Sequence, residues 1–243
     1  MKKCSSITES ALAAAQKLRA TVNTLSFAPP VTHVYNPLDY AWTAHETYLR
    51  RFANTTKKIV FVGMNPGPFG MAQTGVPFGE IAAVRDWLGI YAPIQKPTRE
   101  NPKRPVEGFS CQRSEVSGRR LWGLFAQRFG APEVFFSDHF VVNYCPLIFF
   151  NEARNMTPDK LPLLEQRPLL AACDIHLRAL LDLLQPQWTI GVGVWTETRI
   201  RHALGDATPI RVGRILHPSP ASPIANRGWA QAATQQLRDF GIW

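Results

Sequence analysis

Two turns of the chain carry side chains that can do chemistry: Asn65 in segment 63–71 (GMNPGPFGM) and His217 in segment 217–223 (HPSPASP). The Asn65 amide oxygen can hold a water molecule. His217 opens a loop of three prolines, and a loop that is already ordered loses little entropy when it is pressed against a ligand. For both segments the alternative is an ordinary connection between a strand and a helix.

The composition of segment 63–71 limits what such a ligand could be. Its glycines let the backbone approach a ligand closely, and its prolines stiffen the turn. The segment is not a phosphate-binding P-loop, because no Gly-Lys-Ser/Thr follows, and it does not match GxGxxG in register. Asn143 ends the apolar run 140–143 and must find polar partners there. Those partners are either the neighbouring backbone or the edge of a nucleobase.

The charge of the chain favours a polyanionic partner. Its 27 Lys and Arg against 18 Asp and Glu give a net charge of +9 and a pI of about 9.7, and nucleic acid is the simplest such partner. Many basic residues fall in the Pro-rich loop 96–107 or soon after it, where they either contact phosphates or form a solvated face. They are Lys96, Arg99, Lys103, Arg104, Arg113, Arg119 and Arg120.

The sequence predicts neither a metal site nor an organic cofactor. The four cysteines are Cys4, Cys111, Cys145 and Cys173. None belongs to a CxxC pair and no HxxxH spacing occurs, so we expect reduced, mostly buried thiols, with a cluster of all four as the alternative. Met1–Lys3 begins like a signal peptide, but Glu9, Gln16 and Lys17 interrupt the apolar stretch. No segment reaches the ~20 apolar residues of a membrane span, and we expect a soluble, intracellular protein.

The short apolar run 59–62 stops at Gly63 and is typical of a strand that is buried on both faces of a parallel sheet. A second buried strand is expected at 140–143, and further strands at 188–192 and 210–216. Helical patterns alternate with them, which predicts an α/β fold in which helices cover both faces of the sheet. The expected helices span about 6–24, 40–52, 80–90, 114–129, 163–184 and 225–240, with one more after the third strand. We expect Ser114 to cap the helix 114–129 and Gly130 to end it.

The elements explain how distant residues could form one site. In open α/β sheets, ligands bind outside the carboxyl ends of the strands. Three segments follow such ends, namely 63–67, 143–145 and 217–220. We therefore expect them to meet at one edge of the sheet, within a single domain that spans residues 1–243 and carries the N-terminal helix packed on it.

At this point several segments together resemble one family. Segments 63–71, 75–80 (GVPFGE), 114–118 (SEVSG), 143–147 (NYCPL) and 217–220 (HPSP) are similar to those of the single-strand-selective monofunctional uracil-DNA glycosylases, within the uracil-DNA glycosylase superfamily. The resemblance runs from about residue 40 to the C-terminus. It implies a three-layer α/β/α fold with a central four-stranded parallel sheet. It also implies hydrolysis of the N-glycosidic bond of uracil and C5-modified uracils in DNA, as a step of base excision repair.

The resemblance assigns roles by matched position. Asn65 orients the hydrolytic water and His217 stabilises the departing base. Asn143 reads the base edge and Phe78 stacks on its ring. The full set of implied substrate-binding residues is Gly63, Met64, Gly67, Met71, Phe78 and Asn143, with Gly67 and Met71 near pyrimidine C5. The implied DNA-binding residues are Ser114, Ser117, Pro218, Ser219, Pro220, Ala221, Ser222 and Arg227.

The chain departs from the family pattern at Ala221-Ser222, where the family usually has Arg-Asn in the loop that wedges into the DNA stack. We expect the loop to keep its shape but to hold duplex DNA less firmly. The cysteine pattern of the iron–sulfur members of the superfamily is missing from this sequence. Segments 63–67, 143–145 and 217–220 contain no lysine, the natural Schiff-base nucleophile, so we expect simple hydrolysis without strand cleavage.

Two other functions remain as alternatives. A non-catalytic DNA-binding module would explain the charge, but not Asn65 and His217 together. A hydrolase of free nucleosides or nucleotides would not need a basic track for DNA. The main expectation is a monomeric DNA repair enzyme with no cofactor, located in the cytoplasm or nucleoid of a bacterium or in the nucleus of a eukaryote.

Overall fold

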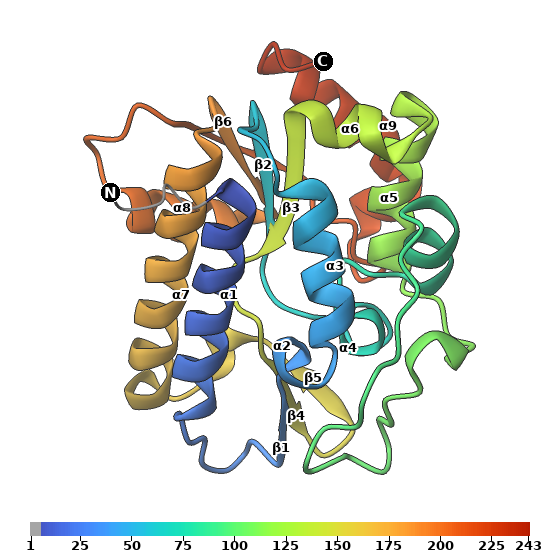
Figure 1. Ribbon diagram of the computed structural model, residues 1–243, viewed down its shortest axis with the longest axis vertical. Helices are drawn as coiled ribbons and strands as arrows, with labels where there is room; N and C mark the ends of the chain where they lie inside the picture. The colour runs from blue at the N-terminus through green and yellow to red at the C-terminus, as the bar shows by residue number, and fades with distance from the viewer. Residues whose placement is uncertain (1–5) are drawn as a thin grey trace.

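The computed structural model describes residues 6–243 (Figure 1). The signal-like start Met1–Lys3 lies outside this range. So does Cys4, one of the four cysteines of the alternative cluster. The other three cysteines are free thiols and buried. No helix within residues 6–243 is long and apolar enough to cross a membrane. In the same range, no three His, Cys, Asp or Glu side chains form a group that could hold a metal ion.

The central sheet has the four predicted strands and all of them are parallel. They are β2 (Ile59–Gly63), β3 (His139–Asn143), β6 (Trp188–Val192) and β7 (Arg211–Ile215). Their order across the sheet is β3-β2-β6-β7. Every residue of β2 and β3 is buried, as expected for strands that are covered on both faces.

Helices lie on both sides of this sheet (Figure 1). On one side, α1 (Ile7–Asn23) and α7 (Leu163–Leu184) run side by side, next to α3 (Trp42–Phe52). On the other side lie α5 (Val116–Phe129) and α9 (Pro223–Asp239). The remaining longer helices are α6 (Pro132–Asp138), which leads into β3, and α8 (Val194–Leu204), which packs on β6, β7 and α7. The three-layer α/β/α expectation is confirmed.

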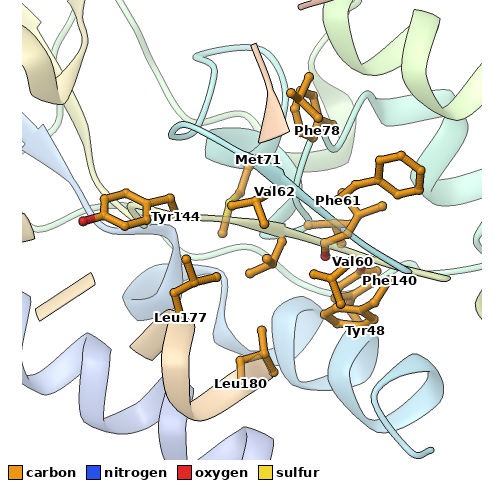
Figure 2. Packing of buried hydrophobic residues seen from close by; sticks show 14 of the residues in the cluster. Tyr48, Val60, Phe61, Val62, Met71, Phe78, Phe140, Tyr144, Leu177 and Leu180 are labelled. Atoms are coloured by element: carbon orange, nitrogen blue, oxygen red, sulfur yellow. Dashed lines mark hydrogen bonds between the residues drawn. The ribbon is translucent and has the colours of Figure 1, made fainter. Parts of the chain in front are cut away.

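The core is formed by side chains that point from the sheet into both helical layers. Figure 2 shows Tyr48, Leu177 and Leu180 below β2, and Phe61 and Phe78 on its other side. All five side chains are buried. Burial of apolar area at about 25 cal/mol per Å² drives this packing, and it fixes the strand ends on which the site is built.

A second, smaller sheet was not predicted. It consists of β1 (His33–Tyr35), β4 (Ile148–Asn151) and β5 (Arg154–Met156), antiparallel and in the order β1-β4-β5. Strands of three or four residues are too short to show a clear alternation, and β1 pairs with a strand more than 100 residues later in the chain. Local sequence patterns carry little information about such a pairing.

Two local expectations need correction. Residues 80–90 contain the π-helical turn η1 (Ala83–Trp87) rather than a regular α-helix. Ser114 does not cap α5, because the N-cap is Glu115 and the Ser114 hydroxyl instead donates to Glu80 Oε1 at 2.7 Å. The short elements α2 (Pro37–Tyr40), α4 (Met71–Thr74), η2 (Gly108–Ser110) and η3 (Pro158–Lys160) complete the described chain.

Candidate active site

The three segments predicted to meet do lie at the carboxyl edge of the parallel sheet. Gly63 at the end of β2 is in register with Asn143 at the end of β3. His217 follows β7, two strands away from β2. Gly193, at the end of the intervening β6, has φ +99° and lets His217 pack against it, since a Cβ there would lie 3.3 Å from the His217 Cβ.

Gly63 is required by close approach rather than by its backbone conformation. A Cβ at this position would lie 2.5 Å from Asn143 Oδ1 and 2.5 Å from Phe78 Cε2, distances that real Cβ atoms do not show. The missing side chain therefore lets Asn143 and Phe78 approach each other over the end of β2. These three residues form the inner end of the site.

The Asn65 amide has a fixed orientation. Its Nδ2 donates to the Leu147 carbonyl oxygen at 3.2 Å and lies 3.5 Å from the Pro66 carbonyl oxygen. Only the NH₂ side of an amide can donate to a carbonyl, so the amide oxygen is the atom available to accept a hydrogen bond from another group. Asn65 is partly exposed, and this oxygen can hold a water molecule.

Asn143 is 6% exposed, and its amide nitrogen contacts Met71 Sδ at 3.3 Å. Sulfur is a weak acceptor, so a stronger acceptor that entered the site would replace it at little cost. The amide therefore offers an NH₂ group beside Met71 and a carbonyl oxygen beside Gly63.

The His217 ring is held in one tautomer. The Ser219 backbone N–H donates to Nδ1 at 3.1 Å, which places the ring proton of the neutral imidazole on Nε2. Burial lowers the pKa of His217 below its usual value, because desolvation disfavours the charged form. At neutral pH the ring is uncharged and presents a single N–H donor.

Phe78 adopts a backbone conformation that is uncommon for a residue with a side chain, with φ +52°. Its carbonyl accepts from the Glu80 N–H at 2.7 Å and lies against Gly118 of α5, where a Cβ would overlap it. The ring is 8% exposed and its centroid lies 6.4 Å from that of His217. Residues held in such an uncommon backbone conformation are typical of functional sites.

The loop that follows His217 is tied to two helices. Arg120 of α5 donates to the Pro218 carbonyl at 3.1 Å and to Asn226 Oδ1 at 2.9 Å. Asn226 in turn donates to the Pro220 carbonyl at 2.8 Å. Ser222 caps α9, since its hydroxyl accepts from the Ala225 N–H at 3.3 Å. The loop is therefore held by hydrogen bonds to which the Ala221 side chain does not contribute.

Comparison with known proteins decides the family. The model of the uracil DNA glycosylase superfamily matches residues 50–238. The single-strand selective monofunctional uracil DNA glycosylase of Mus musculus is 48% identical over 239 residues, which is 98% of this chain and 86% of the relative. The proteins of the same name from Rattus norvegicus (48% identical, 98% and 86% covered) and Bos taurus (46%, 98% and 88%) agree.

This chain belongs to the single-strand-selective monofunctional uracil-DNA glycosylase family.

A solved structure supports the fold of this family member. The crystal structure of wild-type Pedobacter heparinus SMUG2 superposes with a TM-score of 0.65, and the match covers 94% of this chain and 97% of that one. The identity is 17%, so this likeness speaks for the glycosylase fold alone.

The other predicted residues of this glycosylase differ in exposure. Met64 is partly exposed beside Asn65, whereas Pro220, Ala221 and Arg227 are exposed. Arg227 lines a groove between α5 and α9. Gly67 lies in the 63–71 loop, and Ser117 is partly exposed in the first turn of α5.

The basic residues of this glycosylase separate into different environments. Arg104 and Arg113 lie over the ring of Phe69 in the 63–71 loop, at 5.4 and 4.6 Å from its centroid. Lys96 and Lys103 instead pair with Glu100 and Glu152. Arg120 is used to tie the loop after His217. Part of the predicted basic track is therefore already engaged within the protein, at Lys96, Lys103 and Arg120.

Several residues of the site were missed from the sequence. Gly193 carried a usable signal, because it also follows the carboxyl end of a predicted strand. Arg120 and Leu147 were named in the basic track and in a matched motif, but nothing in the sequence indicated their hydrogen bonds, since a backbone acceptor and an arginine on a helix gain such roles only through tertiary contact. Glu115 was seen only as part of a matched motif.

Proposed function

We propose that this protein hydrolyses the N-glycosidic bond of uracil and of C5-modified uracils, such as 5-hydroxymethyluracil, in single- and double-stranded DNA. The product would be an abasic site that enters base excision repair. Family membership makes the protein a monofunctional N-glycosyl hydrolase. One observation carries the proposal: an oriented Asn65 amide oxygen, a neutral His217 donor and the Asn143 amide all lie at the carboxyl edge of the parallel sheet.

The chemistry needs few groups. A base inside a duplex is unreachable, so it must be flipped out or taken from a single strand. Cleavage then gives an oxocarbenium-like sugar and a uracil anion whose charge gathers partly on O2. A His217 Nε2–H directed at O2 stabilises that charge. Because the sugar cation is already electrophilic, Asn65 needs only to orient the water molecule rather than to act as a strong base.

Asn143 is the group proposed to select the base. Uracil offers a donor at N3 and an acceptor at O4, which an amide can meet together through its oxygen and its NH₂ group. Cytosine reverses both and would leave buried groups unpaired. Phe78 would stack on the ring of the base.

We expect Asn143→Asp to lower the rate of uracil release by at least about tenfold, because an ionised carboxyl cannot donate to O4 and leaves it unpaired. Its protonated form can donate or accept, so cytosine release should become measurable. Single-turnover assays on uracil- and cytosine-containing strands test both effects. Unchanged uracil release would make Asn143 a structural residue.

The deciding experiment on the proposed function is the release of free uracil from single-stranded DNA, with and without EDTA. We expect release in both cases, because the proposed mechanism uses no metal or organic cofactor. Absence of free uracil would favour a non-catalytic DNA-binding module. Strong competition by uridine would favour a hydrolase of free nucleosides.

We further propose that DNA is bound by the predicted rim residues and that the protein acts as an intracellular monomer. The rim would include Ser117, the loop 218–222 and Arg227. All of these residues except the buried Pro218 are exposed or partly exposed, which favours this. Ser114 would contribute less, because its hydroxyl already donates to Glu80. The whole chain would work as one domain, since one hydrophobic core includes residues from α1 to α9.

We expect Ala221→Arg to tighten binding to duplex DNA with an abasic site. Ala221 is exposed at the tip of a loop that is fixed without its side chain, so an arginine there could reach the gap left by a flipped base and a nearby phosphate. The slope of the logarithm of the binding constant against the logarithm of the salt concentration should steepen by the amount expected for about one additional phosphate contact. Binding is measured by salt titration on single- and double-stranded product DNA.

The matched control is Ala207→Arg, which adds the same charge at an exposed alanine before β7, at the opposite edge of the sheet. We expect it to change neither slope. Equal tightening of single- and double-stranded DNA by Ala221→Arg would show a general charge effect and contradict the role of the loop as a wedge.

A further inference from the structure

One carboxyl group lies next to the proposed base site without a role in the reaction. Glu115 is the N-cap of α5, and its side chain turns towards the 63–71 loop. A Cβ at Gly67 or at Gly70 would overlap its carboxyl oxygens. Oε2 is buried and has no hydrogen bond of normal geometry among the described residues, although the Gly118 backbone lies close enough to lower the pKa of the carboxyl. A buried polar atom without a partner is costly, so this atom is a candidate for contact with a ligand.

The orientation of the base in the proposed function places C5 on this side. The NH₂ group of Asn143 would donate to O4, and that group now contacts Met71 Sδ. O2 would face His217. C5 is bonded to the carbon that bears O4, so it lies towards Met71 and the residues just before it. Those residues are Gly67–Gly70, against which the Glu115 carboxyl packs.

We propose that Glu115 is a specificity-determining residue that hydrogen-bonds polar substituents at C5 of the flipped pyrimidine. This inference rests on the proposed function. Hydroxymethyl and formyl groups offer a hydroxyl or a carbonyl oxygen to the carboxyl, whereas the methyl group of thymine offers neither. A site built to hydrogen-bond a substituent discriminates strongly against an analogue without it, because its own buried groups stay unpaired.

The electrostatic surroundings let this carboxyl act in both protonation states. Burial, and then the nearby Glu80, raise the pKa of Glu115 to about 7, while the Gly118 backbone opposes the shift. Glu80 is the only charged side chain that contributes to this shift among the described residues. It is itself held by the Ser114 hydroxyl and the Ala83 N–H. The acid can donate to a formyl oxygen, and the carboxylate can only accept, as from a hydroxymethyl group.

The test compares release ratios within each variant, so that changes in overall rate cancel. Single-turnover release of 5-hydroxymethyluracil is divided by release of uracil from the same single-stranded DNA. In Glu115→Ala we expect this ratio to fall about tenfold, the effect of losing one hydrogen bond to a buried polar group. The matched control is Glu107→Gln, which removes the charge of an exposed glutamate shortly before α5 and should leave the ratio unchanged.

A second measurement uses Glu115→Gln, which keeps the shape of the side chain if the alanine variant does not fold. In the wild type, the ratio of 5-formyluracil to 5-hydroxymethyluracil release should fall as the pH rises through about 7. In Glu115→Gln it should stay flat, because an amide donates at every pH. An unchanged ratio in Glu115→Ala, or the same pH dependence in wild type and Glu115→Gln, would overturn the inference. Failure of the wild type to release uracil would instead overturn the proposed function.

Discussion

Replacement of His217 by leucine is expected to lower the single-turnover rate of uracil release at least about 10²-fold. Loss of one preorganised donor to a developing anion typically costs about 2.7–4 kcal/mol of transition-state stabilisation. His217 is well prepared for this role, because Ser219 fixes its tautomer and burial keeps the ring neutral. Leucine has a similar bulk and cannot donate. The loop should persist, since Arg120 and Asn226 hold it through other atoms.

The measurement is the rate of base release under enzyme excess, with His202→Leu on the exposed side of α8 as a matched control. The wild-type rate should also fall as the pH drops through the lowered pKa of His217, because a protonated ring loses the acceptor that Ser219 uses. His217→Leu should lose this acidic limb. A near-wild-type rate in His217→Leu would remove the residue from the mechanism.

Replacement of Asn65 by alanine should have an effect of similar size, also at least about 10²-fold in single-turnover rate. Alanine can neither hold the water molecule nor keep the hydrogen bond to Leu147. The main contribution proposed for Asn65 is orientation of the attacking water molecule. Without the amide, the water molecule is no longer held in the reactive orientation. Binding of abasic DNA should change much less, because the amide makes no proposed contact to the backbone of DNA.

Asn155→Ala, at an exposed asparagine of β5, is the matched control. Rates are compared with binding constants for product DNA. A loss of binding as large as the loss of rate would show that Asn65→Ala disturbs the fold of the 63–71 loop, and the orientation role would then be wrong.

The centre of the parallel sheet was predictable because β2 and β3 are short apolar runs that stop at Gly63 and Asn143. The rule that ligands bind at the carboxyl ends of strands then predicted which segments lie together at one edge of the sheet. The second sheet was missed, because the pairing of His33 with Phe150 leaves no local pattern.

Contacts within the site were predictable to different degrees. The convergence of Asn65, Asn143 and His217 follows from strand order, whereas their hydrogen-bond partners do not. Ser114 shows the limit: a serine before a helix fits the capping pattern, but the carboxylate of Glu80 binds its hydroxyl instead. Such competition between a local and a distant partner is decided by packing, which a single sequence does not display.

The ties between Arg120, Asn226 and the loop after His217 have a consequence for protein engineering. The loop 218–222 is proposed to contact the base stack of DNA, and His217 is proposed to stabilise the leaving group. Both belong to one segment that hydrogen bonds from α5 and α9 hold in place. If a loop from a relative replaced this one without suitable partners at positions 120 and 226, the His217 imidazole would shift together with the loop. A chimera that is meant to change DNA affinity and keep the catalytic rate should therefore exchange residues 217–226 together with position 120.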